Sequence, residues 1–257
     1  MLVAAAVCPC PPLLVPEVAA GAAPELDVVR AACTDALGVL AASRPDLLVV
    51  VGPAGESGRG RHPQGTRGSF GGFGVDLTVR LGRPDTDGAG DSGTGGEHSG
   101  PDGTGQASSG GELPSSLAVA AWLLERTGWS DAPVEGLGVG EPLEPERCVE
   151  TGERIGARAG RVALLVMGDA SACRTLKAPG YLDERAEAFD AEVARALAAA
   201  DVAALKALDA SLAYELKAAG RAPWQILAGA AEGAGLGGAL LHEDAPYGVG
   251  YLVAAWS

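Results

Sequence analysis

The sequence contains few aromatic residues, few histidines and few cysteines, and each shortage excludes a class of protein. Aromatic side chains make up 4% of the 257 residues, so a folded core has to consist mainly of Ala, Val and Leu. Five cysteines are an odd and modest number, which argues against a disulfide scaffold. The three histidines, His62, His98 and His242, are too few for a histidine-rich metal site.

A basic leader and long apolar runs are also missing. The first residues are apolar over only seven positions and include no basic residue, so the sequence predicts no signal peptide. No uninterrupted apolar run reaches the length of a membrane span. Lys and Arg number 19 against 33 Asp and Glu, and the resulting net charge of −14 repels phosphate backbones. We expect a cytoplasmic protein with reduced thiols that binds neither membranes nor nucleic acids.

The apolar residues that are present suffice for one sizeable core. Hydrophobic residues make up 47% of the chain and its mean hydropathy is +0.16, which excludes a wholly disordered protein. Glycine is unevenly distributed, because 11 of the 39 glycines fall in Gly82–Glu112. This segment also contains His98 and almost no apolar residue. We therefore predict a disordered, glycine-rich loop over 82–112 inside a single domain that spans 1–257.

Hydrophobic patterning predicts alternating strands and helices. The expected strands are Leu2–Val7, Leu47–Val51, Val75–Leu81, Val134–Val139, Val162–Met167 and Gly248–Trp256. The expected helices are Pro24–Ala42, Pro114–Arg126, Pro145–Ala159, Tyr181–Ala199, Asp201–Leu208, Ser211–Ala219 and Pro223–Glu232. This order predicts an α/β fold with a mostly parallel central sheet flanked by helices, in which the first two strands form a parallel pair.

Polar residues are expected at one edge of this sheet, because open parallel sheets bind ligands outside the carboxyl ends of their strands. After the first strand these residues are Cys8 and Cys10, and in the long loop after the second they are Glu56, Ser57, Arg59 and His62. After Val162–Met167 they are Asp169, Ser171 and Cys173, and before the last strand they are His242, Glu243, Asp244 and Tyr247. If the segments converge, they form one cleft.

Each of these groups also has a structural interpretation. Cys8 and Cys10 can be small buried side chains beside a turn, thiolate metal ligands or reactive thiols. Asp169 and Ser171 are typical of a turn and an N-cap as well as of a catalytic pair. The run from His242 to Asp244 is by default a turn. Gly233–Gly238 spells the dinucleotide-binding pattern GxGxxG, but a helix precedes it and a strand follows it, which is the wrong context.

Four segments, taken in their order, carry a family resemblance. They are the run from Cys8 to Glu17 (Cys-Pro-Cys-Pro-Pro-Leu-Leu-Val-Pro-Glu), Pro45–Pro53, Gly168–Ala172 and Asp244–Tyr251. They are similar to the N-terminal strand-end motif, the second strand, the Gly-Asp-x-Ser-His stretch and the closing segment of class III extradiol ring-cleavage dioxygenases. The resemblance is strongest to relatives of the protocatechuate 4,5-dioxygenase catalytic subunit, and it covers nearly the whole chain except Gly82–Glu112.

The resemblance implies an oxidoreductase that cleaves catechol-type rings at a non-haem Fe(II), held by two His and one carboxylate, with a further His as acid/base. The chain departs from this pattern, because Cys10 stands at the first His position, Ala54 near the second and Ala172 at the acid/base position. A thiolate ligand would favour Zn or Cu. The candidate residues are Cys10, His62, Glu243 and Asp244 as metal ligands, Asp169 and Ser171 as catalytic groups, Cys8 as a further thiol, and His242 and Tyr247 in the cleft.

Three functions therefore stay open. The first is a metal-dependent dioxygenase with an altered ligand set. The second is a non-catalytic family member that needs no cofactor and binds a small aromatic molecule or a partner subunit, a second copy of the chain included. The third is a thiol-based metal-binding protein that uses Cys8 and Cys10. The missing histidines favour the second function.

Overall fold

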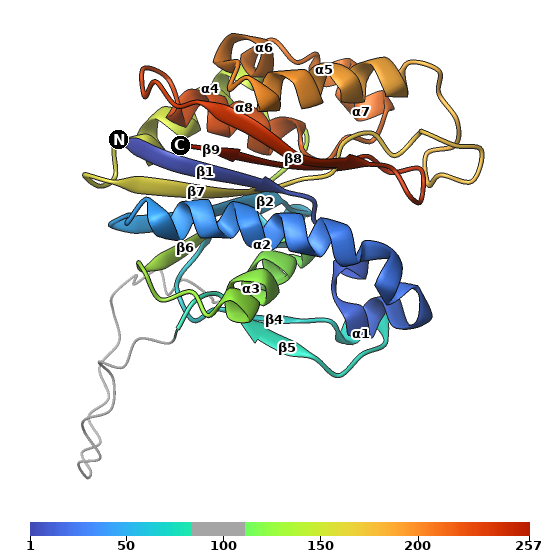
Figure 1. Cartoon of the computed structure of the whole chain (residues 1–257), viewed down its shortest axis with the longest axis horizontal. Coiled ribbons are helices and arrows are strands. Elements are labelled where there is room, and N and C mark those ends of the chain that lie inside the picture. Colours follow the sequence, from blue (N-terminus) through green and yellow to red (C-terminus); the bar gives the residue numbers. More distant parts are fainter. Residues whose placement is uncertain (84–110) are drawn as a thin grey trace, which may run out of the picture.

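A seven-stranded, mostly parallel sheet forms the centre of the computed structural model, which describes residues 1–83 and 111–257 (Figure 1). Its strands are β1 (Leu2–Cys8), β2 (Leu47–Pro53), β3 (Gly60–His62), β6 (Val134–Val139), β7 (Val162–Met167), β8 (Gly238–Asp244) and β9 (Tyr251–Trp256). They lie in the order β3-β6-β2-β7-β1-β9-β8. Strands β6, β2, β7 and β1 are mutually parallel, so their carboxyl ends meet at one edge of the sheet.

Helices cover both faces of this sheet, so that the domain has three layers (Figure 1). One face carries α2 (Asp27–Ala42) and α3 (Ser115–Thr127). The other carries α4 (Pro145–Gly156), α5 (Ala186–Ala198), α6 (Val202–Lys206), α7 (Ala210–Glu215) and α8 (Arg221–Ala230). The short α1 (Pro16–Ala19) follows β1.

The core lies in two halves, one on each side of the sheet, because strand side chains alternate between its faces. In β1, Ala4 belongs to the buried cluster with α2 and α3, whereas Ala5 belongs to the cluster with α5 and α8. Small side chains allow close packing between helices. A Cβ atom on Gly152 of α4 would lie 2.0 Å from the carbonyl oxygen of Ile226 in α8. Close approach of backbones thus compensates for the scarcity of large aromatic side chains.

The structure confirms the predicted α/β class and most of the predicted elements. The strands expected at Leu2–Val7, Leu47–Val51, Val134–Val139 and Val162–Met167 are β1, β2, β6 and β7. The expected pairing of the first two strands is wrong, because β7 lies between β1 and β2 and pairs with both. Helix α2 therefore connects two parallel strands that are separated by one strand, β7.

Several predicted elements are shorter than expected, among them one strand and one long helix. Of Val75–Leu81, only β5 (Thr78–Arg80) is a strand, and it pairs with β4 (Arg67–Ser69) in a separate two-stranded sheet beside α3. The helix expected from Tyr181 begins at Ala186. Tyr181 has a φ of 63°, in the left-handed region, which a right-handed helix excludes.

The remaining differences concern segments expected to be loops. The loop after β2 contributes β3 to the main sheet, and the expected turn from His242 to Asp244 is the end of β8. Most of the predicted disordered loop over 82–112, namely 84–110, lies outside the described residues. Within the described ranges, no helix has the length and apolarity needed to cross a membrane.

Candidate functional site

A cleft lies at the carboxyl edge of the sheet, beyond the ends of β1, β2, β6 and β7. Its volume is about 580 Å³, which is in the range of small-molecule sites. We call it the strand-end cleft, and it is lined by Cys10, Pro11, Pro12, Pro53, Ala54, Gly55, Arg59, Ser115, Ser116, Glu141, Pro142, Asp169 and Ala219. The rule that parallel strands bring their following segments together therefore holds for three of the four expected groups.

Asp169 and Glu141 are partly buried carboxylates that line the strand-end cleft. Oδ1 of Asp169 accepts a hydrogen bond of 2.8 Å from the backbone N–H of Cys10, and the thiol of Cys10 lies 4.0 Å from Oδ2. Burial raises the pKa of Asp169 to about 6, although the hydrogen bond from Cys10 opposes the shift. The carboxylate can therefore gain or lose its proton near neutral pH, and Oδ2 can accept a hydrogen bond from a ligand.

Cys10 and Cys8 are both protonated thiols in this environment. Burial and the negative charge of Asp169 raise the pKa of Cys10 well above its usual value. The pKa of Cys8 is also raised, first by its hydrogen bond with Cys33 and then by burial in the core. A reactive or metal-binding cysteine needs a stabilised thiolate. The surroundings thus favour the interpretation of both residues as small buried side chains.

Helix α3 begins at the strand-end cleft, and Ser116 fixes its position. The Ser116 hydroxyl donates a hydrogen bond of 2.6 Å to the carbonyl of Pro53, at the end of β2. A Cβ atom on Gly52 would lie 2.7 Å from the same hydroxyl oxygen, so the approach of α3 to β2 requires glycine there. Sequence reasoning missed Ser115, Ser116 and Glu141. Glu141 could have been found, because it follows the predicted strand Val134–Val139 just as Asp169 follows Val162–Met167.

Ser171 does not share the cleft with Asp169. It is fully buried, its backbone N–H donates to Oδ1 of Asp190 at 2.8 Å, and its hydroxyl donates to Oδ2 at 2.8 Å. Arg174 also donates to Oδ2 of Asp190, at 3.1 Å. The Ser171 hydroxyl therefore anchors the segment after β7 to α5. This geometry favours the structural interpretation of Ser171 over the catalytic one.

His62 is also committed to structure. It is 7% exposed, and its Nε2 lies 2.9 Å from the carbonyl oxygen of Gly58, which requires Nε2 to donate the proton. It does not line the strand-end cleft. The alternation of β3 places His62 in the interior and its neighbour Arg61 on the exposed side.

The fourth expected group stays away from the strand-end cleft, because β9 separates β8 from β1. His242, Glu243 and Asp244 pair with Val253, Leu252 and Tyr251 in the edge ladder. Glu243 and Asp244 are exposed. Tyr247 donates a hydrogen bond of 2.9 Å to Glu25 and lines another cavity, together with Thr175 and Pro246.

The structure therefore does not bring the predicted metal ligands together, namely Cys10, His62 and Glu243 or Asp244. Across residues 1–83 and 111–257, no group of three or more His, Cys, Asp or Glu side chains could hold a metal ion. The donors in the cleft also do not fit Fe(II), since Asp169 has a protonated thiol beside it and no imidazole.

Comparison with known proteins gives a likeness of fold. No protein-family model matches the chain, and no curated protein does. Among solved structures, the chain is similar to the crystal structure of the uncharacterized protein JW3007 from Escherichia coli K12. The TM-score is 0.52 at 13% sequence identity, and the match covers 99% of each chain. At this identity, the likeness extends to the arrangement of helices and strands and not to the side chains of the site.

Proposed function

We propose that this chain is an extradiol-dioxygenase-like protein that binds a small hydroxylated aromatic acid in the strand-end cleft without cleaving its ring. The observation that carries the proposal is the partly buried carboxylate of Asp169. Its Oδ1 accepts a hydrogen bond from the Cys10 N–H, while the thiol of Cys10 lies 4.0 Å from Oδ2. A partly buried carboxylate gains from a ligand that donates a hydrogen bond to it and replaces the water it has lost.

The other cleft residues indicate the rest of the ligand. Pro11, Pro12, Pro53 and Pro142 give an apolar wall against which a flat ring can pack. Arg59 lines the same cleft and is exposed, and its planar guanidinium suits a carboxylate. A ring with a hydroxyl group toward Asp169 and a carboxylate toward Arg59 meets all three features.

Binding is proposed rather than turnover because the chemistry of the extradiol family needs donors that this cleft does not offer. The positions that correspond to its histidines are occupied by Cys10, Ala54 and Ala172. The raised pKa of Cys10 also argues against a thiolate nucleophile. What the residues present can do is orient a hydroxyl group on Asp169 and exclude water from it.

The test is calorimetric titration with protocatechuate at pH 8, for the wild type, Asp169→Asn and the matched control Asp35→Asn. Asp35 lies exposed on α2, outside the strand-end cleft. We expect the wild type and Asp35→Asn to bind equally and Asp169→Asn to bind about tenfold more weakly, the value of one charge-assisted hydrogen bond. Wild-type affinity should also fall as the pH decreases through about 6, where Asp169 becomes protonated.

Oxygen consumption distinguishes binding from turnover. Protein loaded with Fe(II) under anaerobic conditions and then exposed to air with protocatechuate should consume no more oxygen than the free metal ion does. Ring cleavage at a rate that Asp169→Asn abolishes would replace this proposal with the dioxygenase hypothesis. Absence of binding by wild-type protein would remove both.

A cytoplasmic location belongs to the same proposal. All five cysteines lie in the described ranges, all are buried and none forms a disulfide. Free thiols are typical of proteins in a reducing compartment. Fractionation of cells that express the full-length chain tests this expectation.

A further inference from the structure

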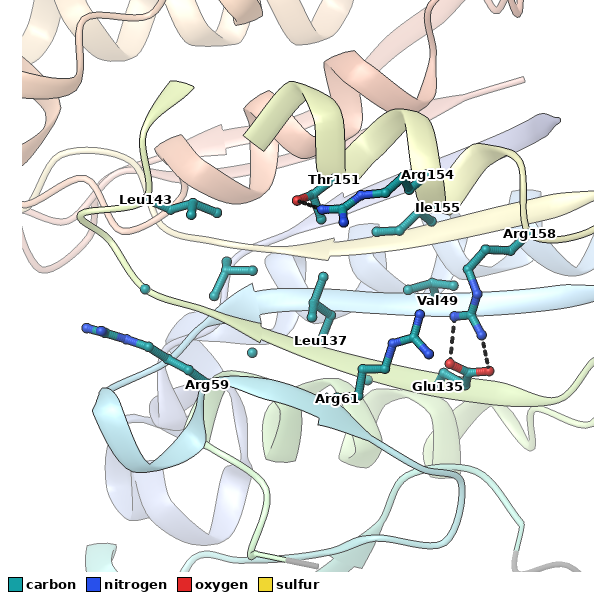
Figure 2. A pocket seen from close by; sticks show the side chains of 14 residues that line it. Val49, Arg59, Arg61, Glu135, Leu137, Leu143, Thr151, Arg154, Ile155 and Arg158 are labelled. Carbon is teal, nitrogen blue, oxygen red and sulfur yellow. Dashed lines mark hydrogen bonds and ion pairs between the residues drawn. The ribbon is translucent and has the colours of Figure 1, made fainter. Parts of the chain in front are cut away.

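A second cavity lies on the other side of β6 from α3 and is lined by positive charge, whereas the protein as a whole is acidic. It lies between β6 and α4, has a volume of about 400 Å³ and is shown in Figure 2. Its floor is apolar, formed by Val49, Leu137, Val139, Leu143 and Ile155. Four arginines surround this floor, namely Arg59, Arg61, Arg154 and Arg158. We call this cavity the arginine pocket.

The arginine pocket is a positive region in an acidic protein. Its charged lining residues are four arginines and Glu135, so the local formal charge is 4 − 1 = +3, whereas the whole chain carries −14. A concave, apolar site that gathers charge of one sign focuses the electrostatic potential and attracts ions of the opposite sign. The distribution of charge therefore points to an anion as the ligand.

Only part of this charge is neutralised within the protein. Arg158 forms a two-point ion pair with Glu135, with both N–O distances at 2.6 Å. Arg154 donates hydrogen bonds to the hydroxyl of Thr151 at 3.0 Å and to the carbonyl of Glu150 at 3.3 Å, both uncharged acceptors. Arg154 thus keeps its charge without an ionic partner in the described part of the chain.

Arg61 is the arginine most available to a ligand. Its side chain makes no hydrogen bond or ion pair with any described residue, and its charge lowers the pKa of Glu135, after the larger effect of the Arg158 hydrogen bonds. Its neighbour His62 is buried, so the strand alternation directs Arg61 to the pocket side of β3. Figure 2 shows Arg61 reaching toward the space between β6 and α4, whereas the guanidinium of Arg59 lies apart from it.

We propose that the arginine pocket is a second ligand site, distinct from the strand-end cleft, and that it binds a small organic anion with an apolar body and a terminal carboxylate. The apolar body covers the floor around Leu137 and Ile155. The carboxylate accepts paired hydrogen bonds from Arg61, whose planar fork matches its geometry. The volume suits a ligand of modest size.

Three probes of equal chain length test the proposal by calorimetry on the full-length chain. Octanoate has the proposed chemistry, octanol keeps the apolar body without the charge, and octylamine reverses the charge. We expect octanoate to bind at least tenfold more tightly than octanol, and octylamine not to bind. The affinity for octanoate should fall with added salt, as expected for an ionic contact near the surface.

Two variants should change octanoate binding in opposite directions. Arg61→Gln should weaken it about tenfold, because one charge-assisted hydrogen-bonding group is lost. Glu135→Gln should strengthen it about threefold, because the competing carboxylate loses its charge while its amide still accepts a hydrogen bond from Arg158. The matched control is Arg147→Gln, since Arg147 is an exposed arginine of α4 outside the pocket, and it forms an ion pair with Glu150.

Equal binding of octanoate and octanol, or equal loss in Arg61→Gln and Arg147→Gln, would overturn the proposal. So would weaker binding by Glu135→Gln with its fold intact by circular dichroism. Asp169→Asn should leave octanoate binding unchanged, because Asp169 is not part of the pocket. Failure here is therefore distinguishable from failure of the strand-end cleft, for which the probe is protocatechuate.

Discussion

The charged carboxylate of Asp169 should lower the stability of the folded protein, and the substitution Asp169→Asn should therefore raise it. Burial raises the pKa of Asp169 from about 4 to about 6. A difference of about two in pKa corresponds to about 3 kcal/mol of penalty on the charged form in the folded state. Because Asp169 is partly exposed, we expect Asp169→Asn to gain less than this, about 1 to 2 kcal/mol at pH 8. The asparagine oxygen can still accept the hydrogen bond from Cys10.

The sign of the effect fixes its pH dependence. The folded-state pKa lies above the unfolded value, so the penalty is complete above about 6 and disappears below about 4. Urea unfolding of the wild type, Asp169→Asn and Asp35→Asn from pH 4 to pH 8 measures this penalty as a difference in the free energy of unfolding. The wild type should lose stability relative to Asp169→Asn as the pH rises through this window. If Asp169→Asn is less stable than the wild type at pH 8, or if their difference in stability does not vary with pH, burial does not penalise the charged carboxylate of Asp169.

Three further substitutions test side-chain contacts that hold the fold together. Asp190→Ala should lower the free energy of unfolding by about 3 kcal/mol in urea, because both donors of Ser171 lose their buried acceptor. Arg221→Met should cost about 2 kcal/mol and weaken protocatechuate and octanoate alike in calorimetry, since Arg221 is buried and holds the carbonyl of Leu143 at 2.6 Å. Asp201→Ala should cost about 1 kcal/mol in thermal unfolding, because its carboxylate caps α6.

The parts of the fold that could be predicted are those with a strong local signal. The apolar runs of β1, β2 and β7 are buried on both faces, and short continuous apolar runs of this kind are typical of interior strands in a parallel sheet. Their order in the sheet could not be read from them, since β7 pairs with two strands more than 100 residues earlier. The short β3 and the left-handed Tyr181 also left no periodic pattern in the sequence.

The position of the strand-end cleft could be predicted from the sequence, but only some of its lining residues could. Cys10 and Asp169 each follow a strand directly, so the topology alone brings them together. Ser171 lies only two residues beyond Asp169, yet its hydroxyl donates a hydrogen bond to the buried carboxylate of Asp190, nineteen residues later. No local sequence pattern predicts that contact. His62 lies in the segment that follows β2, which predicts a place in the cleft, but its position in β3 directs its side chain into the interior.

The two proposed sites share a wall, which links their occupancies. Arg59 lines both the strand-end cleft and the arginine pocket, and the segment after β6 gives Glu141 to the first and Leu143 to the second. Arg221 holds this segment by donating hydrogen bonds to the carbonyls of both residues from the N-terminus of α8. A ligand that shifts the segment in one site therefore alters the lining of the other. Any such coupling between binding free energies has to be reciprocal, so protocatechuate and octanoate should change each other's affinity by the same factor.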